Sequence, residues 1–151
     1  MSNLTIFANH ALIAALTGWV IAQLVKVPLH YLHARQWNWS LLFTAGGMPS
    51  SHSALVAGLA HCLGLLYGFD SPFYAIGFTV AMVVIYDATG IRRQAGKHAR
   101  IINQIITDLA SGHPLKQEKL REVLGHSPME ALVGTLLGLA TAQILWMLYW
   151  Q

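Results

Sequence analysis

"ALVAGLAHCLGLLYGFDSPFYAIGFTVAMVVIY", residues 54 to 86, contains two apolar runs with a short polar break between them. The break, GFDSP at residues 68 to 72, combines the Gly, Asp, Ser and Pro residues that form tight turns. A helix that crosses the hydrocarbon core of a bilayer needs about 20 mostly apolar residues, and both runs come close to this length. The stretch therefore predicts two membrane helices joined by a turn, over residues 54 to 69 and 73 to 86.

Two further apolar segments flank this pair. One covers residues 12 to 27 and can start as early as residue 4, and the other covers residues 129 to 150. Of all 151 residues, 55% are apolar and only 10% are charged, whereas soluble domains have about 25% charged residues. We therefore expect an all-α integral membrane protein with a single membrane domain, residues 1 to 151, built as a bundle of about four transmembrane helices.

The positive charges predict the topology. All nine Lys and Arg residues lie in two polar zones, residues 26 to 53 and 87 to 128. Because cytoplasmic segments are enriched in Lys and Arg, both zones are predicted to be cytoplasmic and both termini to lie on the opposite side. Four crossings place both polar zones on one side and both termini on the other only if residues 36 to 48 do not cross the membrane. We therefore interpret that segment as re-entrant or interfacial.

The second polar zone contains a basic cytoplasmic insertion at about residues 91 to 127. Its first part has apolar residues at helical spacing, which indicates an amphipathic helix in the membrane interface. A second short helix is predicted over residues 115 to 124, so the insertion would form a helical hairpin. The apolar residues of the first helix are Ile101, Ile102, Ile105, Ile106 and Leu109.

The net charge and the spacing of small residues indicate which partners to expect. The net charge of +3 fits anionic membrane lipids and is too small for a nucleic-acid partner. The single cysteine, Cys62, excludes an internal disulfide and is interpreted as a core residue. Gly134, Gly138 and Ala142 are four residues apart and predict a close-packing face, used either within the bundle or in a homodimer.

Two predicted helix starts carry similar polar residues. "MPSSHSA", residues 48 to 54, and "GHSPMEA", residues 125 to 131, each combine Pro, Ser and His. A helix start presents free N–H groups and the positive end of the helix dipole, so it attracts anions. Lys26, Arg92 and Arg93 are predicted on the same side of the membrane. Together these residues predict a phosphate site in which one imidazole attacks phosphorus and the other protonates the leaving alcohol.

Structural roles are an alternative for the same residues. Ser127 and Glu130 have the spacing of a capping box, which accounts for Glu130 without catalysis. Any one of the eight histidines can be a hydrogen-bonded structural residue. A metal site is a weaker alternative, because no pair of histidines has a zinc spacing with carboxylate or thiolate support, and we expect no cofactor. The histidines considered for it are His30, His33, His98, His113 and His126.

Three stretches carry a resemblance to a known family. "MPSSHSA", "YDATGIRRQAGKHA" and "LGHSPMEALVGTLLG" occur in this order and cover much of the chain. They resemble the small, divergent branch of the type 2 phosphatidic acid phosphatase superfamily, whose relatives include acid phosphatases and vanadium haloperoxidases. The superfamily pattern is Lys, six residues, Arg-Pro; then Pro-Ser-Gly-His; then Ser-Arg, five residues, His, three residues and Asp.

The resemblance implies roles for individual residues. His126 would be the catalytic nucleophile, Glu130 the carboxylate that orients it, and His52 the general acid. Asp87 is interpreted as an ion partner of an arginine at the membrane boundary, where an unpaired carboxylate would be costly, and Lys97 as a supporting cation. The phosphate-binding residues would be Lys26, Ser50, Ser51, Arg92 and Arg93.

This sequence departs from the superfamily pattern at four points. Ser51 replaces the glycine, Glu130 replaces the aspartate, and no Arg-Pro follows Lys26, for which Arg35 is the only arginine within reach. In addition, 32 residues separate Arg93 from His126, where the superfamily has five. The long spacing fits the basic insertion predicted above.

The resemblance and the residues together predict a membrane lipid phosphatase. It would hydrolyse a lipid phosphate monoester or diphosphate, such as phosphatidate, phosphatidylglycerophosphate or an isoprenyl phosphate, through a phosphohistidine. The alternative is a non-catalytic membrane protein that binds anionic lipid or a partner through its basic face. In both cases we expect the bacterial inner membrane or an equivalent membrane, with the active face in the cytoplasm.

Overall fold

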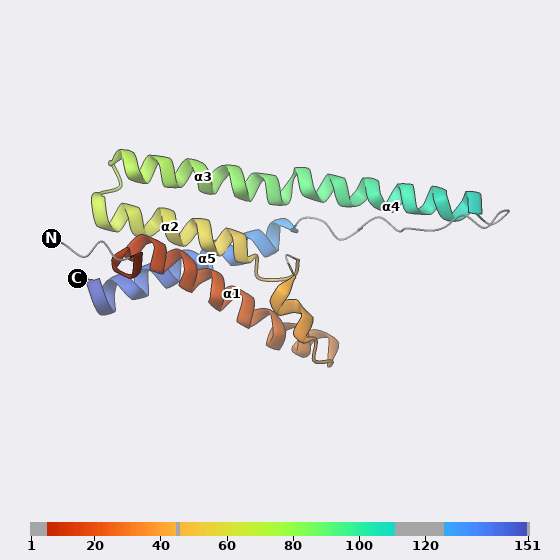
Figure 1. The fold of residues 1–151 in the computed structure, drawn as a ribbon, viewed down its shortest axis with the longest axis horizontal. Coiled ribbons are helices and arrows are strands. Elements are labelled where there is room, and N and C mark those ends of the chain that lie inside the picture. Colours follow the sequence, from red (N-terminus) through yellow and green to blue (C-terminus); the bar gives the residue numbers. More distant parts are fainter. Residues whose placement is uncertain (1–5, 45, 111–125, 151) are drawn as a thin grey trace.

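The computed structural model describes residues 6–44, 46–110 and 126–150, and every regular element in these ranges is helical. The five long helices are α1 (His10–Ala34), α2 (Ser51–Tyr67), α3 (Pro72–Thr89), α4 (Ile91–Ala110) and α5 (Pro128–Leu145). Shorter turns lie at Ile6–Ala8, Trp39–Phe43 and Trp146–Trp150. Helix α2 lies in the middle of the bundle and packs against α1, α3 and α5 (Figure 1).

This arrangement confirms the predicted membrane bundle. In the described part of the chain, three helical stretches have the length and apolar character needed to cross a bilayer: His10–Ala34, Pro72–Thr107 and Pro128–Trp150. The fourth crossing would be α2, which is apolar but shorter, at 17 residues. Large apolar side chains are exposed on the outside of the bundle, where a bilayer would cover them. They include Leu24, Ile76, Val83, Leu136 and Ile144.

Polar caps fix where the helices begin. Asn9, Ser50, Ser71 and Ser127 precede α1, α2, α3 and α5, and the side-chain oxygen of each accepts a backbone N–H from the first turn. A cap of this kind satisfies an N–H group that has no partner inside the helix. The predicted starts at residues 54, 73 and 129 therefore lie within a few residues of the observed ones.

Helices α2 and α5 pack backbone to backbone. A Cβ atom added to Gly134 would overlap the carbonyl oxygen of Ser50, and one added to Gly138 would overlap that of Ala54. Ala142 is fully buried in the same contact region. The sequence left open whether this small-residue face serves the bundle or a homodimer, and the structure places it inside the bundle.

A polar pair lies within the apolar part of the same interface. The His61 imidazole on α2 is 2.9 Å from the Gln143 amide oxygen on α5. A polar group that faces only lipid has no hydrogen-bond partner, so two such groups stabilise the bundle by pairing with each other.

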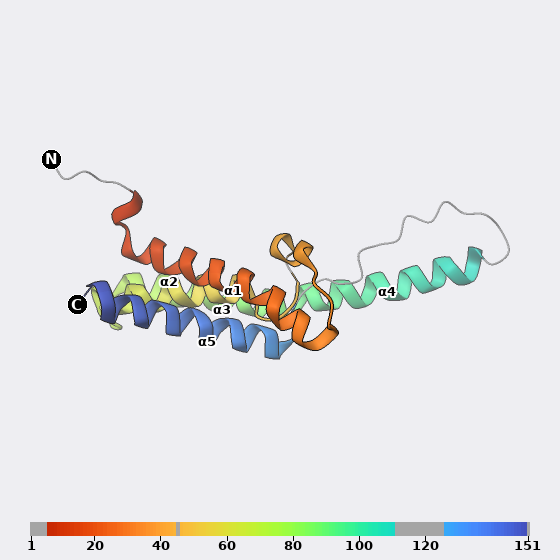
Figure 2. The ribbon, with the colours of Figure 1, turned by 90° about the horizontal axis from the view of Figure 1, so that it is seen from below.

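Helix α4 extends beyond the bundle. It continues the direction of α3 through Gly90, whose N–H donates to the Tyr86 carbonyl and whose carbonyl accepts from the Gln94 N–H (Figures 1 and 2). The predicted amphipathic helix is therefore present as α4, with Ile101, Ile105 and Leu109 exposed, and it runs on from the third membrane helix. The predicted helix at residues 115 to 124 falls outside the described residues.

The segment before α2 folds against the end of α1. Residues Trp39–Phe43 form a single 3-10 turn that packs on α1. The Gln23 amide donates to the Leu42 carbonyl at 2.8 Å, and the Lys26 ammonium donates to the Thr44 carbonyl at 3.1 Å. Two side chains of α1 thus hold this segment, and it does not cross the bundle (Figure 2).

Candidate active site

The start of α5 brings an imidazole and a carboxylate together. The Nδ1 atom of His126 lies 2.9 Å from Oε2 of Glu130. The same oxygen accepts the Ser127 N–H at 3.2 Å, and the Glu130 N–H donates to the Ser127 hydroxyl at 3.3 Å, which completes a capping box. Glu130 therefore both caps the helix and orients the imidazole. A carboxylate next to Nδ1 keeps the proton on that nitrogen and leaves the lone pair on Nε2.

Backbone hydrogen bonds connect this pair to the ends of two other helices. The His126 N–H donates to the Ala88 carbonyl near the end of α3 at 2.9 Å. The Ser50 N–H, just before α2, donates to the Glu130 carbonyl at 3.0 Å. Three helix ends are thus joined at one point, so the imidazole is held on a rigid part of the bundle, where only 4% of the His126 surface is exposed.

The second predicted histidine lies next to the first. The ring centroids of His52 and His126 are 6.5 Å apart, and the two rings are inclined at 52°. His52 is in the first turn of α2 and is exposed, whereas His126 is buried. Residues 74 positions apart in the chain are therefore neighbours at one end of the bundle.

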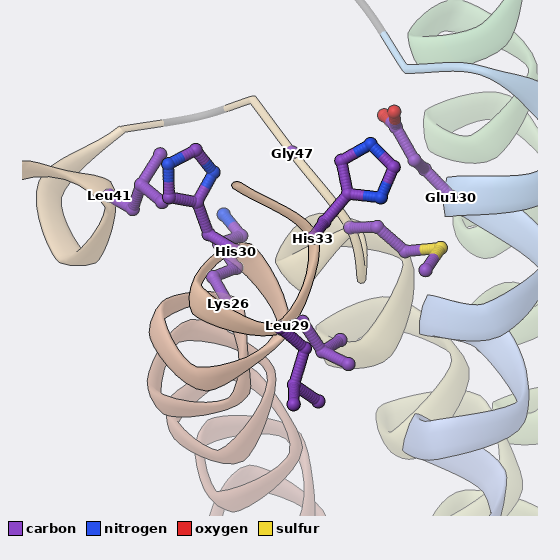
Figure 3. Close-up of a pocket in the computed structure, with 9 residues that line it drawn as sticks. Lys26, Leu29, His30, His33, Leu41, Gly47 and Glu130 are labelled. Atoms are coloured by element: carbon purple, nitrogen blue, oxygen red, sulfur yellow. The ribbon is translucent and has the colours of Figure 1, made fainter. Parts of the chain in front are cut away.

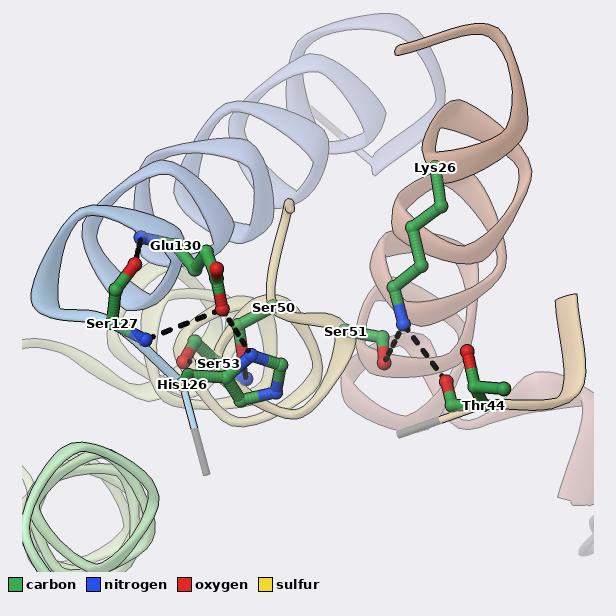
Figure 4. A network of polar contacts seen from close by, with 8 residues as sticks. All are labelled: Lys26, Thr44, Ser50, Ser51, Ser53, His126, Ser127 and Glu130. Carbon is green, nitrogen blue, oxygen red and sulfur yellow. Dashed lines mark hydrogen bonds and ion pairs between the residues drawn. The ribbon is translucent and has the colours of Figure 1, made fainter. Parts of the chain in front are cut away.

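The serines of the first turn of α2 have different surroundings. Ser50 is fully buried, and its hydroxyl oxygen accepts hydrogen bonds from the Ser53 N–H and the Ser53 hydroxyl. Ser51 faces the opposite way, toward α1, where its oxygen is 3.5 Å from the Lys26 ammonium nitrogen. Figure 4 shows these two groups on either side of the start of α2. Ser50 therefore acts in this structure as a helix cap, and Ser51 is the serine next to the lysine.

Lys26 is a buried cation. Its side chain is 2% exposed, and its ammonium group donates to the Thr44 carbonyl and approaches the Ser51 hydroxyl. An ammonium group has three N–H donors, and the described hydrogen bonds use two of them. A buried ammonium group is costly unless it is paired, so the Thr44 carbonyl and the Ser51 hydroxyl, or an anion bound beside them, stabilise it.

The remaining predicted residues lie on the helix that continues α3. Asp87 is in the last turn of α3, and Arg92, Arg93 and Lys97 lie in the first two turns of α4. The backbone thus places the two arginines four and five positions after Ala88, whose carbonyl binds His126. The side chains of Arg92, Arg93 and Lys97 fall outside the described residues, so the ion pair proposed for Asp87 remains a prediction.

An open cavity of about 580 Å³ lies next to this site. Lys26, His30 and His33 line it from α1, Gly47 and Met48 from the loop before α2, and Glu130 from α5 (Figure 3). Neither His52 nor His126 is among its lining residues. The cavity is completed by Leu29, Leu32 and Leu41.

His30 and His33 were not among the residues predicted for the phosphate site. Their spacing from Lys26, at four and seven residues, places all three side chains on one face of a helix, which was a usable signal. Arg35, the only arginine within reach of Lys26, instead has a left-handed backbone with φ of 56° at the end of α1 and does not line the cavity.

Comparison with known proteins identifies the family. The profile described as "Divergent PAP2 family" matches residues 7–141. The chain belongs to the divergent PAP2 family. A relative in Bacillus subtilis (strain 168), described as "Uncharacterized membrane protein YuiD", is 38% identical over 93% of this chain and 96% of its own length. No solved structure matches the chain.

The site of this divergent PAP2 protein brings imidazole, carboxylate, hydroxyl and ammonium groups together at one end of the bundle. It contains an imidazole oriented by a carboxylate, a second imidazole beside it, and a buried ammonium group near a hydroxyl. Among the described residues, no three His, Cys, Asp or Glu side chains gather closely enough to hold a metal ion.

Proposed function

We propose that this protein is a membrane lipid phosphatase that hydrolyses a lipid phosphate monoester or diphosphate through a phosphohistidine at His126. The observation that supports it most directly is the 2.9 Å hydrogen bond between His126 Nδ1 and Glu130, beside the His52 ring. Membership of the divergent PAP2 family adds support, because the superfamily to which that name refers contains phosphatases.

In the first step, Nε2 of His126 attacks phosphorus. The P–N bond forms as the bond between phosphorus and the leaving oxygen breaks. His52 donates a proton to this oxygen, so a monoester leaves as the lipid alcohol and a diphosphate leaves as the lipid monophosphate. Glu130 stabilises the positive charge that develops on the His126 ring. Rings with centroids 6.5 Å apart can contact one phosphoryl group from two sides, as in-line transfer requires.

In the second step, water attacks the phosphohistidine. His52, now neutral, accepts a proton from this water, the P–N bond breaks and inorganic phosphate is released. The catalytic cycle returns both imidazoles to their starting protonation states. Neither step needs a redox partner.

Cations would stabilise the charge on the transferred group. Lys26 is already close to the start of α2, where the helix dipole also favours an anion. In the proposal, Lys26 and Ser51 bind phosphate oxygens from this side, and Arg92 and Arg93 bind them from the end of α3. Ser50 has the supporting role of holding the helix start, since its hydroxyl is buried and engaged with Ser53.

The substrate is proposed to be a lipid because the site lies at one end of a membrane bundle. At this position a headgroup can reach the site while the acyl or isoprenyl chains remain in the bilayer. The membrane would be the bacterial inner membrane or its equivalent, and the face would be cytoplasmic because the Lys and Arg residues concentrate there.

The experiment measures phosphate release by the purified full-length protein. Candidate substrates are phosphatidate, phosphatidylglycerophosphate and an isoprenyl phosphate, each supplied in mixed micelles with EDTA. We expect turnover, inhibition by vanadate and an acid-labile phosphoprotein, all of which His126→Ala should lose. The control is His98→Gln, which replaces an exposed histidine on α4. Full turnover by His126→Ala would rule out the phosphohistidine mechanism.

A second candidate function is non-catalytic binding of anionic lipid by the basic face. The observation in its favour is that Glu130 is explained as a capping-box residue without any catalysis. In this case His52→Ala and His126→Ala would retain lipid binding, whereas reversing the charges of Arg92, Arg93 and Lys97 together would abolish it. Absence of phosphate release from all three substrate classes would favour this function.

A further inference from the structure

The cavity at the end of α1 contains two histidines, His30 and His33, that the proposed chemistry does not use, beside Lys26, which it does use. Lys26, His30 and His33 lie on one face of α1, and all three line the cavity. His30 is partly exposed and His33 is exposed, so both rings are accessible from the cavity. The described hydrogen bonds leave these two histidines without an assigned structural role, in contrast to His61 and His126.

The lining of the cavity matches a phosphate-bearing lipid. Imidazole N–H groups and an ammonium group are hydrogen-bond donors to phosphate oxygens. The other lining side chains include Leu29, Leu32, Leu41 and Met48, which are apolar. A cavity with donors grouped on one helix face and apolar residues around them suits a molecule that has both a charged and an apolar part.

The position of the cavity relative to the membrane supports the same occupant. Helix α1 has 25 residues, which corresponds to about 37 Å of helix. The hydrocarbon core is about 30 Å thick, so the last turns of α1 extend into the headgroup region. Trp37 and Trp39, which stack on each other next to the end of α1, are typical of this level.

We propose that this cavity is the headgroup site for a lipid carrying a phosphate monoester, and that His30 and His33 are headgroup-binding residues. Before any reaction at His126, the lipid's phosphate would contact His30, His33 and Lys26, and its chains would leave past Leu29 and Leu32. Glu130 lines the cavity and also binds His126, so the headgroup site would adjoin the reacting histidine. The substrate class rests on the proposed function, but the binding site itself can be tested without turnover.

The experiment uses full-length His126→Ala protein in phosphatidylcholine nanodiscs, because this variant does not consume the ligand. Dihexanoyl phosphatidate is titrated and binding is measured by isothermal titration calorimetry. We expect His30→Gln and His33→Gln each to weaken binding several-fold, and the double variant to weaken it by about tenfold or more. His98→Gln, on the exposed surface of α4, should bind as the parent does.

Inorganic phosphate is titrated in parallel to distinguish a lipid site from a free-anion site. It should bind far more weakly, because it lacks the chains that contact the apolar lining. Equal affinity for inorganic phosphate would overturn the lipid assignment. Unchanged phosphatidate affinity in the double histidine variant would overturn the role of His30 and His33. The same conclusion would follow if Arg35→Gln lowered the affinity and the histidine variants did not.

The same titration separates this inference from the proposed function. If wild-type protein releases no phosphate but the two histidines bind phosphatidate, the phosphatase proposal fails and the headgroup site stands. If phosphate is released but the double variant binds phosphatidate normally, the phosphatase proposal stands and the headgroup site fails.

Discussion

The carboxylate of Glu130 lies 2.9 Å from the imidazole Nδ1 of His126, and its same oxygen caps the helix that begins after Ser127. One atom therefore performs a structural and an orienting task. Glu130→Ala removes both tasks and cannot distinguish them, whereas Glu130→Gln separates them. A glutamine oxygen can still accept the cap hydrogen bond, whereas it cannot stabilise a charged imidazole.

Glu130→Gln should therefore lower kcat by about 100-fold while changing the free energy of unfolding by less than about 1 kcal/mol. Glu130→Ala should lower kcat to a similar extent and also cost about 1 kcal/mol of stability, because the cap is lost. Phosphate release and thermal unfolding in detergent measure the two effects. A Glu130→Gln variant with normal kcat would show that Glu130 is only a capping residue.

Lys26 and Gln23 provide a matched pair of variants. Both side chains of α1 donate hydrogen bonds to the segment before α2, Lys26 to Thr44 and Gln23 to Leu42. Lys26→Met should raise KM at least about tenfold, because it removes the cation proposed to bind phosphate. Gln23→Leu should weaken the same segment by about 1 kcal/mol but leave KM almost unchanged. Equal changes in KM would mean that Lys26 only holds this segment in place.

The contact between α2 and α5 predicts a strong effect of small substitutions. Gly138→Ala would place a methyl group against the Ala54 carbonyl, a backbone atom that cannot move aside without shifting α2. We expect a loss of about 1–3 kcal/mol in the free energy of unfolding. Ala140→Val, on the exposed side of α5, is the control and should change it by about 0.5 kcal/mol or less. Unfolding is measured by denaturant titration in detergent micelles.

The buried polar pair can be tested with a double-mutant cycle. His61→Leu or Gln143→Leu alone leaves one polar group without its partner, and the double variant removes both. We expect each single variant to be destabilised and the double variant to recover part of the loss. The interaction energy should be about 0.6 kcal/mol and at most about 2 kcal/mol. An interaction energy of zero would show that the two side chains do not pair in the membrane.

Local signals in the sequence predicted much of the helical structure. The Ser and Pro residues of "MPSSHSA" and "GHSPMEA" indicated where α2 and α5 begin, and the turn GFDSP indicated where α3 begins, because a helix cap is satisfied by residues within one turn of it. The end of α1 was predicted less well, at Val27 and not at Ala34. Hydropathy marks the part of a helix inside the bilayer, whereas hydrogen bonding continues the helix past Pro28 and the two histidines of its last turns.

The sequence by itself determined that this is a helical membrane protein and that His126, Ser127 and Glu130 share one helix start. These features depend on hydrogen bonds between neighbours in the chain and on the transfer of apolar side chains into lipid. The tertiary structure alone decided that His52 lies beside His126, that Gly134 and Gly138 face α2, and that His30 and His33 line a cavity with Lys26. Such relationships depend on how helices pack, and packing is set by close contacts between residues far apart in the chain.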